Sequence, residues 1–327
     1  MPPELRVGTR GSQLALWQAN AVAERIAALG GPSCRLVVIQ TSGDRLQQAP
    51  LSEVGGKRLF VKEIEDALLR DSIDLAVHSS KDMPAMLPEG LEIAAVLPRE
   101  DPFDAVVLPQ TLHPPPIVTI EALVSVLGQS PSVATGSVRR IAQLRRLLPG
   151  ARFAPIRGNL DTRLRKLDEG AHHALVLAAA GLRRLGFDSR ISFALPVTAC
   201  VPAPGQGIVA VEIRDGDKVV RRALERINDA DARAELVAER AVVEGLGGGC
   251  QTPIGALATS LGGGRLEIVA AVVALDGSRV VRGQASGPQS QAASIGAQVA
   301  ARLIDEGAGE ILAEARGAQT PVEGIQP

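Results

Sequence analysis

A lysine and an aspartate stand next to each other directly after an apolar segment, residues 73–78, that we expect to be a strand. They are Lys81 and Asp82, in the order His78-Ser79-Ser80-Lys81-Asp82. At the end of a strand, the lysine ammonium favours the ionised form of the neighbouring carboxylate, while the walls of the sheet partly desolvate it. Such a pair can do acid–base chemistry. From these residues alone, an ordinary loop ion pair is an equally good interpretation.

A second candidate is a cysteine on a glycine-rich segment, Gly247-Gly248-Gly249-Cys250. The missing side chains leave the thiol accessible and allow a bulky group to approach the backbone. A lone cysteine is more often a small core residue, and we assign that role to Cys34 and a structural role to Cys200. The glycines favour an exposed, reactive thiol at Cys250.

Residues 139–190 carry eleven arginines and one lysine against four acidic residues, an excess of eight positive charges. Many of these arginines stand where a predicted strand passes into a helix, which is where α/β sheets bind ligands and where helix N-termini favour anions. The planar guanidinium fork suits carboxylates and phosphates. We expect the four arginines next to turns to bind a polyanion: Arg139, Arg140, Arg157 and Arg163. Four others fit a solvated helix face better: Arg145, Arg146, Arg165 and Arg190.

Two further segments resemble anion sites less strongly. Arg10 and Ser12 also stand between a predicted strand and a helix, although Ser12 alone is more often a helix cap. The run Val54-Gly55-Gly56-Lys57 lacks the spacing of a nucleotide phosphate loop. We interpret residues 42–58 as a flexible lid, because they are polar, rich in glycine and proline, and without periodicity.

The elements that must position these residues alternate between strand and helix over the first two-thirds of the chain. Alternation of this kind predicts mostly parallel sheets with helices on both faces. The expected strands are residues 5–7, 35–40, 73–78, 91–96, 104–108, 132–135, 153–156 and 174–177. The expected helices are residues 12–26, a helix starting at 137, and residues 162–167 and 182–185.

The pattern changes after about residue 227. A helix at 232–243 precedes three strands, 256–260, 266–275 and 279–284, which are joined by glycine-containing turns and followed by a helix at 290–305. Strands without intervening helices predict an antiparallel sheet. We therefore expect an α+β domain here, and a frayed tail after Arg316.

Composition excludes several classes of protein. The 327 residues suit two or three domains, and with 46 % apolar but only 2 % aromatic residues the cores must be aliphatic. A net charge of −1 does not favour nucleic acid as a partner. The start of the chain has no apolar core of a signal peptide, and no apolar run could span a bilayer. Three widely spaced cysteines match neither disulfides nor a metal site. We expect a cytoplasmic protein without membrane partners.

Nine motifs in order resemble the hydroxymethylbilane synthase (porphobilinogen deaminase) family across nearly the whole chain. The first three are TRGSQLALWQA, VGGKRLFVKEIE and AVHSSKDMP. The next four are REDPFDA, ATGSVRRIAQL, IRGNLDTRLRKLD and LAAAGLRRLG. PAPGQG and GGGCQTPIGA complete the set. Each motif is weak alone, whereas nine in family order are highly specific.

The resemblance implies an α/β fold of two lobes like those of periplasmic binding proteins, with mostly parallel sheets, plus a C-terminal α+β domain with a three-stranded antiparallel sheet. Domain 1 would comprise residues 1–99 and 207–226, domain 2 residues 100–206, and domain 3 residues 227–327. It further implies a dipyrromethane cofactor held by a thioether to Cys250. Four porphobilinogens would be added to it with loss of ammonia, and hydrolysis would release hydroxymethylbilane.

The same resemblance implies roles for individual residues. Asp82 would be catalytic. The cofactor-binding residues besides Cys250 would be Asp44, Lys81, Thr135, Ser137, Arg139, Arg140, Arg163 and Arg184. The substrate-binding residues would be Arg10, Ser12, Phe60, Arg157 and Arg163. It implies a monomer that passes its product to the next enzyme of tetrapyrrole synthesis.

Two other interpretations compete with this one. The first is a two-lobed binding protein without chemistry, which the glycine-rich Cys250 segment in an additional domain disfavours. The second is an inactive relative of the synthases, which the presence of both Asp82 and Cys250 disfavours. A covalent dipyrromethane that survives denaturation would separate all three.

Overall fold

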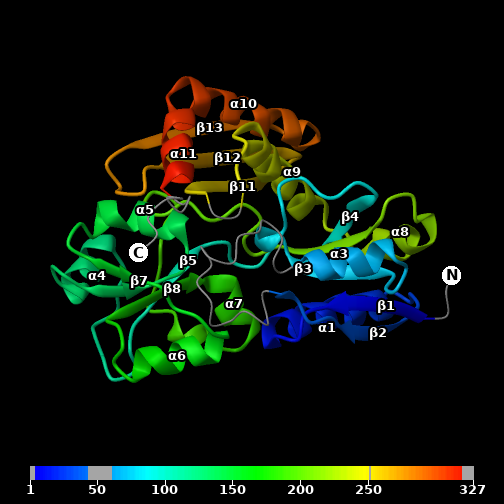
Figure 1. Ribbon diagram of the computed structural model, residues 1–327, viewed down its shortest axis with the longest axis horizontal. Helices are drawn as coiled ribbons and strands as arrows, with labels where there is room; N and C mark the ends of the chain where they lie inside the picture. Colours follow the sequence, from blue (N-terminus) through cyan, green and yellow to red (C-terminus); the bar gives the residue numbers. More distant parts are fainter. Residues whose placement is uncertain (1–3, 43–60, 250–251, 319–327) are drawn as a thin grey trace, which may run out of the picture.

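The computed structural model describes residues 4–42, 61–249 and 252–318 (Figure 1). Each of three sheets has its own covering helices, and the unit at the C-terminal end lies above the other two in Figure 1. This is the mixed α/β fold predicted from the sequence. The exact domain boundaries stay a prediction.

The first sheet has five strands in the order β2-β1-β3-β10-β4. Their bounds are Ser33–Val38, Glu4–Thr9, Leu75–Ser79, Val209–Arg214 and Leu91–Val96. Strand β1 runs parallel to β2 and β3, whereas β10 pairs antiparallel with β3 and β4. In the sequence, β10 follows all the strands of the second sheet, so the first sheet is completed by a strand from a much later part of the chain. Its helices are α1 (Gln13–Ala28), α3 (Lys62–Leu69) and α8 (Lys218–Leu224).

The second sheet also has five strands, in the order β7-β6-β8-β5-β9. Their bounds are Arg152–Ala154, Ser132–Ala134, Ala174–Ala178, Asp104–Val107 and Phe193–Ala194. Strand β6 is parallel to β7 and β8, and β5 is antiparallel to β8 and β9. The helices of this unit are α4 (Ile120–Leu127), α5 (Val138–Leu147), α6 (Leu160–Asp168) and α7 (Ala179–Arg184).

The third sheet is antiparallel, in the order β11-β12-β13, as the sequence predicts. The strands are Ile254–Gly262, Arg265–Val273 and Val280–Pro288. Three helices complete the unit: α9 (Ala230–Gly245), α10 (Ala292–Asp305) and α11 (Ala308–Gly317). Among the residues described in all three units, the largest fully buried side chains are all leucine or isoleucine, which confirms the aliphatic cores.

Two serine side chains cap the N-termini of helices that border the active-site cleft described below. The Ser12 Oγ accepts from the Ala15 amide at 3.3 Å and the Ser137 Oγ from the Arg140 amide at 3.4 Å, so both act as N-caps. The helix starts predicted at these serines are confirmed.

Several predicted bounds are wrong by a few residues. The strand expected at 153–156 ends at Ala154, because Pro155 lacks the amide that would continue the ladder. The helix expected at 182–185 begins earlier, at Ala179. Helices α3, α4 and α8 were not predicted, since each has eight residues or fewer and so shows too little periodicity. Within the described ranges, no helix is both long and apolar enough to cross a bilayer.

Gly296 on α10 allows that helix to pack closely against α9. A Cβ at this position would lie 2.1 Å from the backbone oxygen of Ala238. We expect Gly296→Ala to destabilise the protein by about 1–3 kcal/mol, because this overlap outweighs the gain of about 1 kcal/mol in helix propensity. Urea unfolding would measure the change. The control is Gly309→Ala on α11, where a Cβ meets nothing within 4 Å and stability should hold or rise. Equal stabilities for the two variants would contradict the close packing.

Candidate active site

A cavity of about 420 Å³ lies between the units built on the first and second sheets. We call it the cleft. Its volume falls in the range of roughly 300–1,000 Å³ usual for small-molecule sites. The structure brings nine of the predicted site residues to its walls: Arg10, Ser12, Lys81, Asp82, Ser137, Arg140, Arg157, Arg163 and Arg184.

Strand ends explain why residues distant in sequence meet there. Strands β1 and β3 are parallel neighbours, so Arg10 after β1 and Lys81 after β3 emerge at the same edge of the first sheet. From the second sheet, Ser137 follows β6 and begins α5, and Arg157 precedes α6. The cleft is therefore bordered by helix starts, where backbone amides already favour anions.

Asp82 ends a short 3₁₀ turn, Ser80–Asp82, directly after β3. Its side chain is exposed to the cleft, whereas we expected it to be partly buried. The difference arises because Lys81, and not Asp82, turns into the protein. The Lys81 Nζ donates to the Gln206 Oε1 at 3.5 Å. Asp82 is the only acidic side chain among the described residues that line the cleft.

Lys81 has an unusual proton affinity for a lysine. Loss of hydration lowers its pKa to about 8; the neighbouring Asp82 opposes the shift, and the positive charge of Arg140 adds to it. The ammonium is therefore close to losing its proton at mildly alkaline pH. A bound carboxylate would raise this pKa again, because an opposite charge stabilises the ammonium.

Arg163 and Arg184 approach the cleft from α6 and α7. The Arg163 Nε donates to the Gly158 oxygen at 2.8 Å, and its pKa is lowered by desolvation and by Arg140. The Arg184 Nη2 donates to the Gly207 oxygen at 2.6 Å, and its guanidinium lies 5.5 Å from the ring centroid of Trp17 on α1. Desolvation lowers the pKa of Arg184 to about 10. Both shifts show cations that are incompletely solvated.

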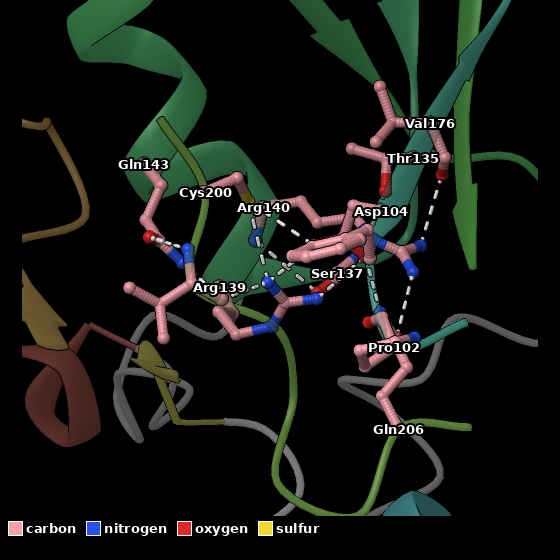
Figure 2. Close-up of polar contacts among 12 residues, drawn as sticks. Pro102, Asp104, Thr135, Ser137, Arg139, Arg140, Gln143, Val176, Cys200 and Gln206 are labelled. Atoms are coloured by element: carbon pink, nitrogen blue, oxygen red, sulfur yellow. Dashed lines mark hydrogen bonds and ion pairs between the residues drawn. The ribbon is translucent and has the colours of Figure 1, made fainter. Parts of the chain in front are cut away.

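Asp104, the first residue of β5, binds two of the predicted arginines at once (Figure 2). Arg139 donates to both of its oxygens, with Nη1 2.7 Å from Oδ2 and Nη2 3.0 Å from Oδ1. The Arg140 Nε donates to Oδ1 at 2.8 Å. All three side chains are buried. Burial is the largest single effect and by itself would raise the pKa of Asp104, but the two arginines and Gln206 together hold this pKa far below its usual value.

Gln206 joins this cluster to Lys81. Its Nε2 donates to the Asp104 Oδ1 at 3.0 Å and to the Pro102 oxygen at 2.7 Å, while its Oε1 also accepts from the Arg140 Nη2 at 3.4 Å. Sequence analysis missed both Asp104 and Gln206 as residues of the site. Both lie in motifs quoted above, REDPFDA and PAPGQG, but a motif alone does not show which of its residues contacts the site.

A second, smaller cavity of about 90 Å³ lies beside the segment that carries Cys250. Gly249 and Thr252, which flank the residues outside the described ranges, line it together with Lys81, Ser137 and Arg139. The Thr252 Oγ1 donates to the Gly249 oxygen at 2.5 Å, so the two ends of the loop are held together. This places the base of the Cys250 loop within reach of the residues around the cleft.

The three glycines before Cys250 have different physical roles. Gly247 has a φ of +59°, a left-handed conformation that favours glycine. At Gly248 a Cβ would lie 2.3 Å from the Ile254 side chain, whereas at Gly249 it would meet nothing within 4 Å. Open space at this end of the loop agrees with the expectation that a bulky group can approach there.

The remaining predicted residues lie elsewhere. Thr135 is buried and lines neither cavity; its Oγ1 accepts from the Ser137 amide at 3.4 Å. Arg139 lines only the smaller cavity. Asp44, Phe60 and Cys250, and the expected lid except for Ser42, lie outside the described residues.

Two of the four arginines assigned to a solvated surface have a different role. Arg145 and Arg146 donate to the oxygens of Leu275 and Gly277 on the turn between β12 and β13, and so join the second and third units. Arg165 stays exposed and pairs with Glu169 one turn along α6, as predicted. The surface prediction is wrong for Arg190, whose side chain is only 11 % exposed and pairs with Asp168, 22 residues away in the sequence.

The fold and the two cavities define a class of protein. Two α/β units enclose a cationic cleft with one exposed carboxylate, and a third unit brings a glycine-rich loop to its edge. Within the described ranges, no cluster of histidine, cysteine and acidic side chains could hold a metal ion. This is a two-lobed α/β protein for a polyanionic ligand, with an added loop-bearing domain.

Comparisons with known proteins agree with this class. Residues 5–222 match the family model "Porphobilinogen deaminase, dipyromethane cofactor binding domain", and residues 233–305 match its C-terminal domain. A porphobilinogen deaminase of Syntrophobacter fumaroxidans is 45 % identical, over 95 % of this chain and 97 % of that protein. One of Desulforudis audaxviator is 46 % identical, over 97 % and 99 %. The chain belongs to the porphobilinogen deaminase family, as its motifs predict.

Among solved structures, the VFT2 domain of Bordetella pertussis BvgS matches with a TM-score of 0.41 at 16 % identity, over 69 % of this chain and 87 % of that one. An ancestral cationic amino acid binding protein gives a TM-score of 0.41 at the same identity, over 68 % and 87 %.

Family membership confirms the predicted fold class and activity. The chain is a transferase of tetrapyrrole biosynthesis that condenses porphobilinogen to hydroxymethylbilane with release of ammonia. It has a domain that binds the dipyrromethane cofactor.

Lys81 lines the cleft as well as the smaller cavity, so its low pKa predicts how substrate binding depends on pH. Below about pH 8 the ammonium is charged and attracts carboxylates; above it the charge and this contribution are lost. We expect the KM for porphobilinogen to rise as pH increases from 8 to 9.5. In Lys81→Arg the cation persists to higher pH, because a guanidinium stays protonated there. The alkaline rise in KM should then be much smaller. Identical pH profiles of KM for the two proteins would show that Lys81 does not contribute.

Proposed function

We propose that this enzyme attaches its dipyrromethane cofactor to Cys250 and performs each condensation of porphobilinogen with Asp82. The observation that carries the proposal is the charge of the cleft. Among the described residues, six cationic side chains and a single carboxylate, Asp82, line it. The cationic six are Arg10, Lys81, Arg140, Arg157, Arg163 and Arg184.

The cationic residues match the chemistry of the substrate. Each pyrrole unit brings an acetate and a propionate, so a growing chain carries negative charges that only nearby cations can neutralise in an enclosed cleft. A hydrogen bond to a charged group contributes about 1.5–3 kcal/mol. Several arginines therefore bind a chain with many carboxylates without making release impossible. We assign Arg10, Ser12 and Arg157 to the substrate and Arg140 and Arg184 to the cofactor, with Arg163 between both.

The residues around the smaller cavity fit the cofactor. Gly249 and Thr252 bring the loop of Cys250 to Lys81, Ser137 and Arg139, which supply an ammonium, a hydroxyl and a guanidinium for its carboxylates. When bound, the cofactor supplies the pyrrole carbon to which the first substrate becomes joined. A thioether suits this role because it resists hydrolysis through repeated cycles.

Asp82 can serve three successive proton and charge requirements. It delivers a proton to the substrate amine, and the carbon–nitrogen bond breaks with its electron pair leaving on ammonia. The carboxylate then faces the positive charge of the resulting azafulvene. After the new carbon–carbon bond has formed, the same carboxylate accepts the proton lost from the pyrrole ring. Its exposure to the cleft supports this role, since the acid must touch each incoming unit.

The cellular location, oligomeric state and domain boundaries of the enzyme are part of the same proposal. The enzyme acts as a cytoplasmic monomer and passes its product to the next tetrapyrrole enzyme. The free thiols of Cys34 and Cys200 support a reducing compartment. The boundaries of three domains near residues 99, 206 and 227 also belong to this proposal.

The first test concerns the attachment point. Intact-protein mass spectrometry should show one two-pyrrole adduct, and peptide mapping should place it at Cys250. Cys250→Ser should lose the adduct and the activity that depends on it, because an ordinary hydroxyl is a much weaker nucleophile than a thiol. Cys34→Ser is the control and should keep both. An adduct mapped to Cys34 or Cys200 would refute the assignment.

The second test concerns Asp82. Asp82→Asn keeps the shape of the side chain and removes its charge and basic oxygen, so kcat should fall by about 10²–10⁴-fold or more. The variant should fold normally, as measured by thermal unfolding. Asp82→Glu should retain part of the activity, because the carboxylate is displaced by one methylene only. Near-normal turnover of Asp82→Asn would show that another acid performs the chemistry, and Asp44 would be the next to substitute.

A further inference from the structure

The buried carboxylate of Asp104 is the centre of a cluster that the proposed mechanism does not use. It is fully buried and accepts hydrogen bonds from Arg139, Arg140 and Gln206 (Figure 2). The Cys200 thiol also donates to its Oδ2 at 3.3 Å. These donors come from α5 and from the segment between β9 and β10, so this one carboxylate joins parts of the chain that are distant in sequence.

The two arginines need such a partner because of where they stand. Arg139 and Arg140 are consecutive residues in the first turn of α5, where the helix dipole is unfavourable for cations. Successive side chains on a helix point about 100° apart, since a turn takes 3.6 residues. Both guanidinium groups nevertheless converge on Asp104. A buried anion between them offsets their repulsion and their unfavourable position in the helix.

Each of these arginines also donates to a backbone oxygen. The Arg140 Nη1 donates to the Val176 oxygen at 3.0 Å, and the Arg139 Nη1 to the Val201 oxygen at 2.6 Å. Each guanidinium is thereby held in one orientation. Arg140 lines the cleft and Arg139 lines the smaller cavity beside the Cys250 loop. Asp104 stands behind both walls and lines neither cavity.

We propose that Asp104 is a positioning residue that orients both arginines before either ligand arrives. It holds Arg139 toward the cofactor cavity and Arg140 in the wall of the cleft, where Arg140 meets the incoming substrate as well as the cofactor. One carboxylate thus orders a cation for each of two neighbouring sites. An arginine that is already oriented loses little conformational freedom when it binds a carboxylate, which increases affinity. Arg139 and Arg140 together carry two positive charges against the single negative charge of Asp104, so the three side chains keep a net charge of +1. The inference rests on the proposed function, because it assigns ligands to both arginines.

The test compares Asp104→Asn with wild type in the full-length enzyme. Asparagine has the same shape but lacks the charge that holds two guanidinium groups. We expect the fraction of folded protein that carries the two-pyrrole mass to fall. In the loaded fraction, the KM for porphobilinogen should rise at least tenfold, while kcat per loaded enzyme stays within about threefold. A merely structural role would lower thermal stability and the active fraction and leave KM unchanged.

Asp168→Asn is the matched control. Asp168 also accepts two hydrogen bonds from one arginine, Arg190, in the same unit, but neither residue lines a cavity. This variant should load cofactor and bind substrate as wild type does. A KM raised equally in both variants would overturn the inference, because any lost ion pair of this unit would then have the same effect.

A double variant keeps the test decisive if Asp104→Asn does not fold. The double variant Asp104→Asn with Arg139→Gln removes one cation together with the anion. The net charge of the buried cluster is then the same as in wild type, whereas Asp104→Asn alone makes it more positive. If Asp104 acts through Arg139, adding Asp104→Asn to Arg139→Gln should reduce cofactor loading further by less than threefold. A larger further loss would overturn the action through Arg139.

Failure of the inference can be distinguished from failure of the proposed function. Absence of the two-pyrrole mass in wild type would contradict the function itself. If wild type carries the adduct and Asp104→Asn has the same loading and KM, the function stands and the positioning role is refuted.

Discussion

Cations that must bind a polyanion together have to be held close to one another before the anion is present. Six cationic side chains of the described ranges line the cleft, and without a ligand they repel each other in a partly desolvated space. Backbone oxygens solve much of this problem. Val176, Gly207 and Gly158 accept hydrogen bonds from Arg140, Arg184 and Arg163, so each guanidinium rests on a neutral acceptor that leaves its charge available. The carbonyl groups thus do what water would do in a more open site.

Asp104, the buried carboxylate between Arg139 and Arg140, marks the place where neutral acceptors are not sufficient. Two consecutive arginines at a helix start combine their own repulsion with an unfavourable dipole, and an anion is required there. Asp82, the proposed catalytic acid, stands apart from this cluster and is exposed on the opposite wall. In the proposed mechanism, one acid orders the cations and another exchanges protons. The pKa of Lys81 is lowered mainly by loss of hydration, and the positive charge of Arg140 adds to the shift.

Much of this arrangement could be predicted from the sequence. Ser12 and Ser137 begin helices as expected, because a capping side chain depends on local sequence. The grouping of arginines at strand-to-helix junctions followed from the geometry of parallel sheets. Other features depend on tertiary contacts that no local pattern contains. Asp104 reads as an ordinary strand residue, and the contacts of Arg145 and Arg146 with the third unit require the position of a distant hairpin.

The position of β10 in the first sheet has a consequence for synthesis on the ribosome. Strands β3 and β4 do not pair with each other; β10 lies between them, and it is made more than a hundred residues after β4. The first lobe therefore has two open strand edges until the chain beyond residue 214 has emerged. The second lobe is continuous in sequence and can complete its sheet earlier. Although the N-terminal lobe starts the chain, its sheet cannot be completed until β10 has been synthesised. Contacts between residues this distant in sequence also form slowly. During that interval the strand edges of the first lobe stay exposed, and only other molecules in the cell can cover them.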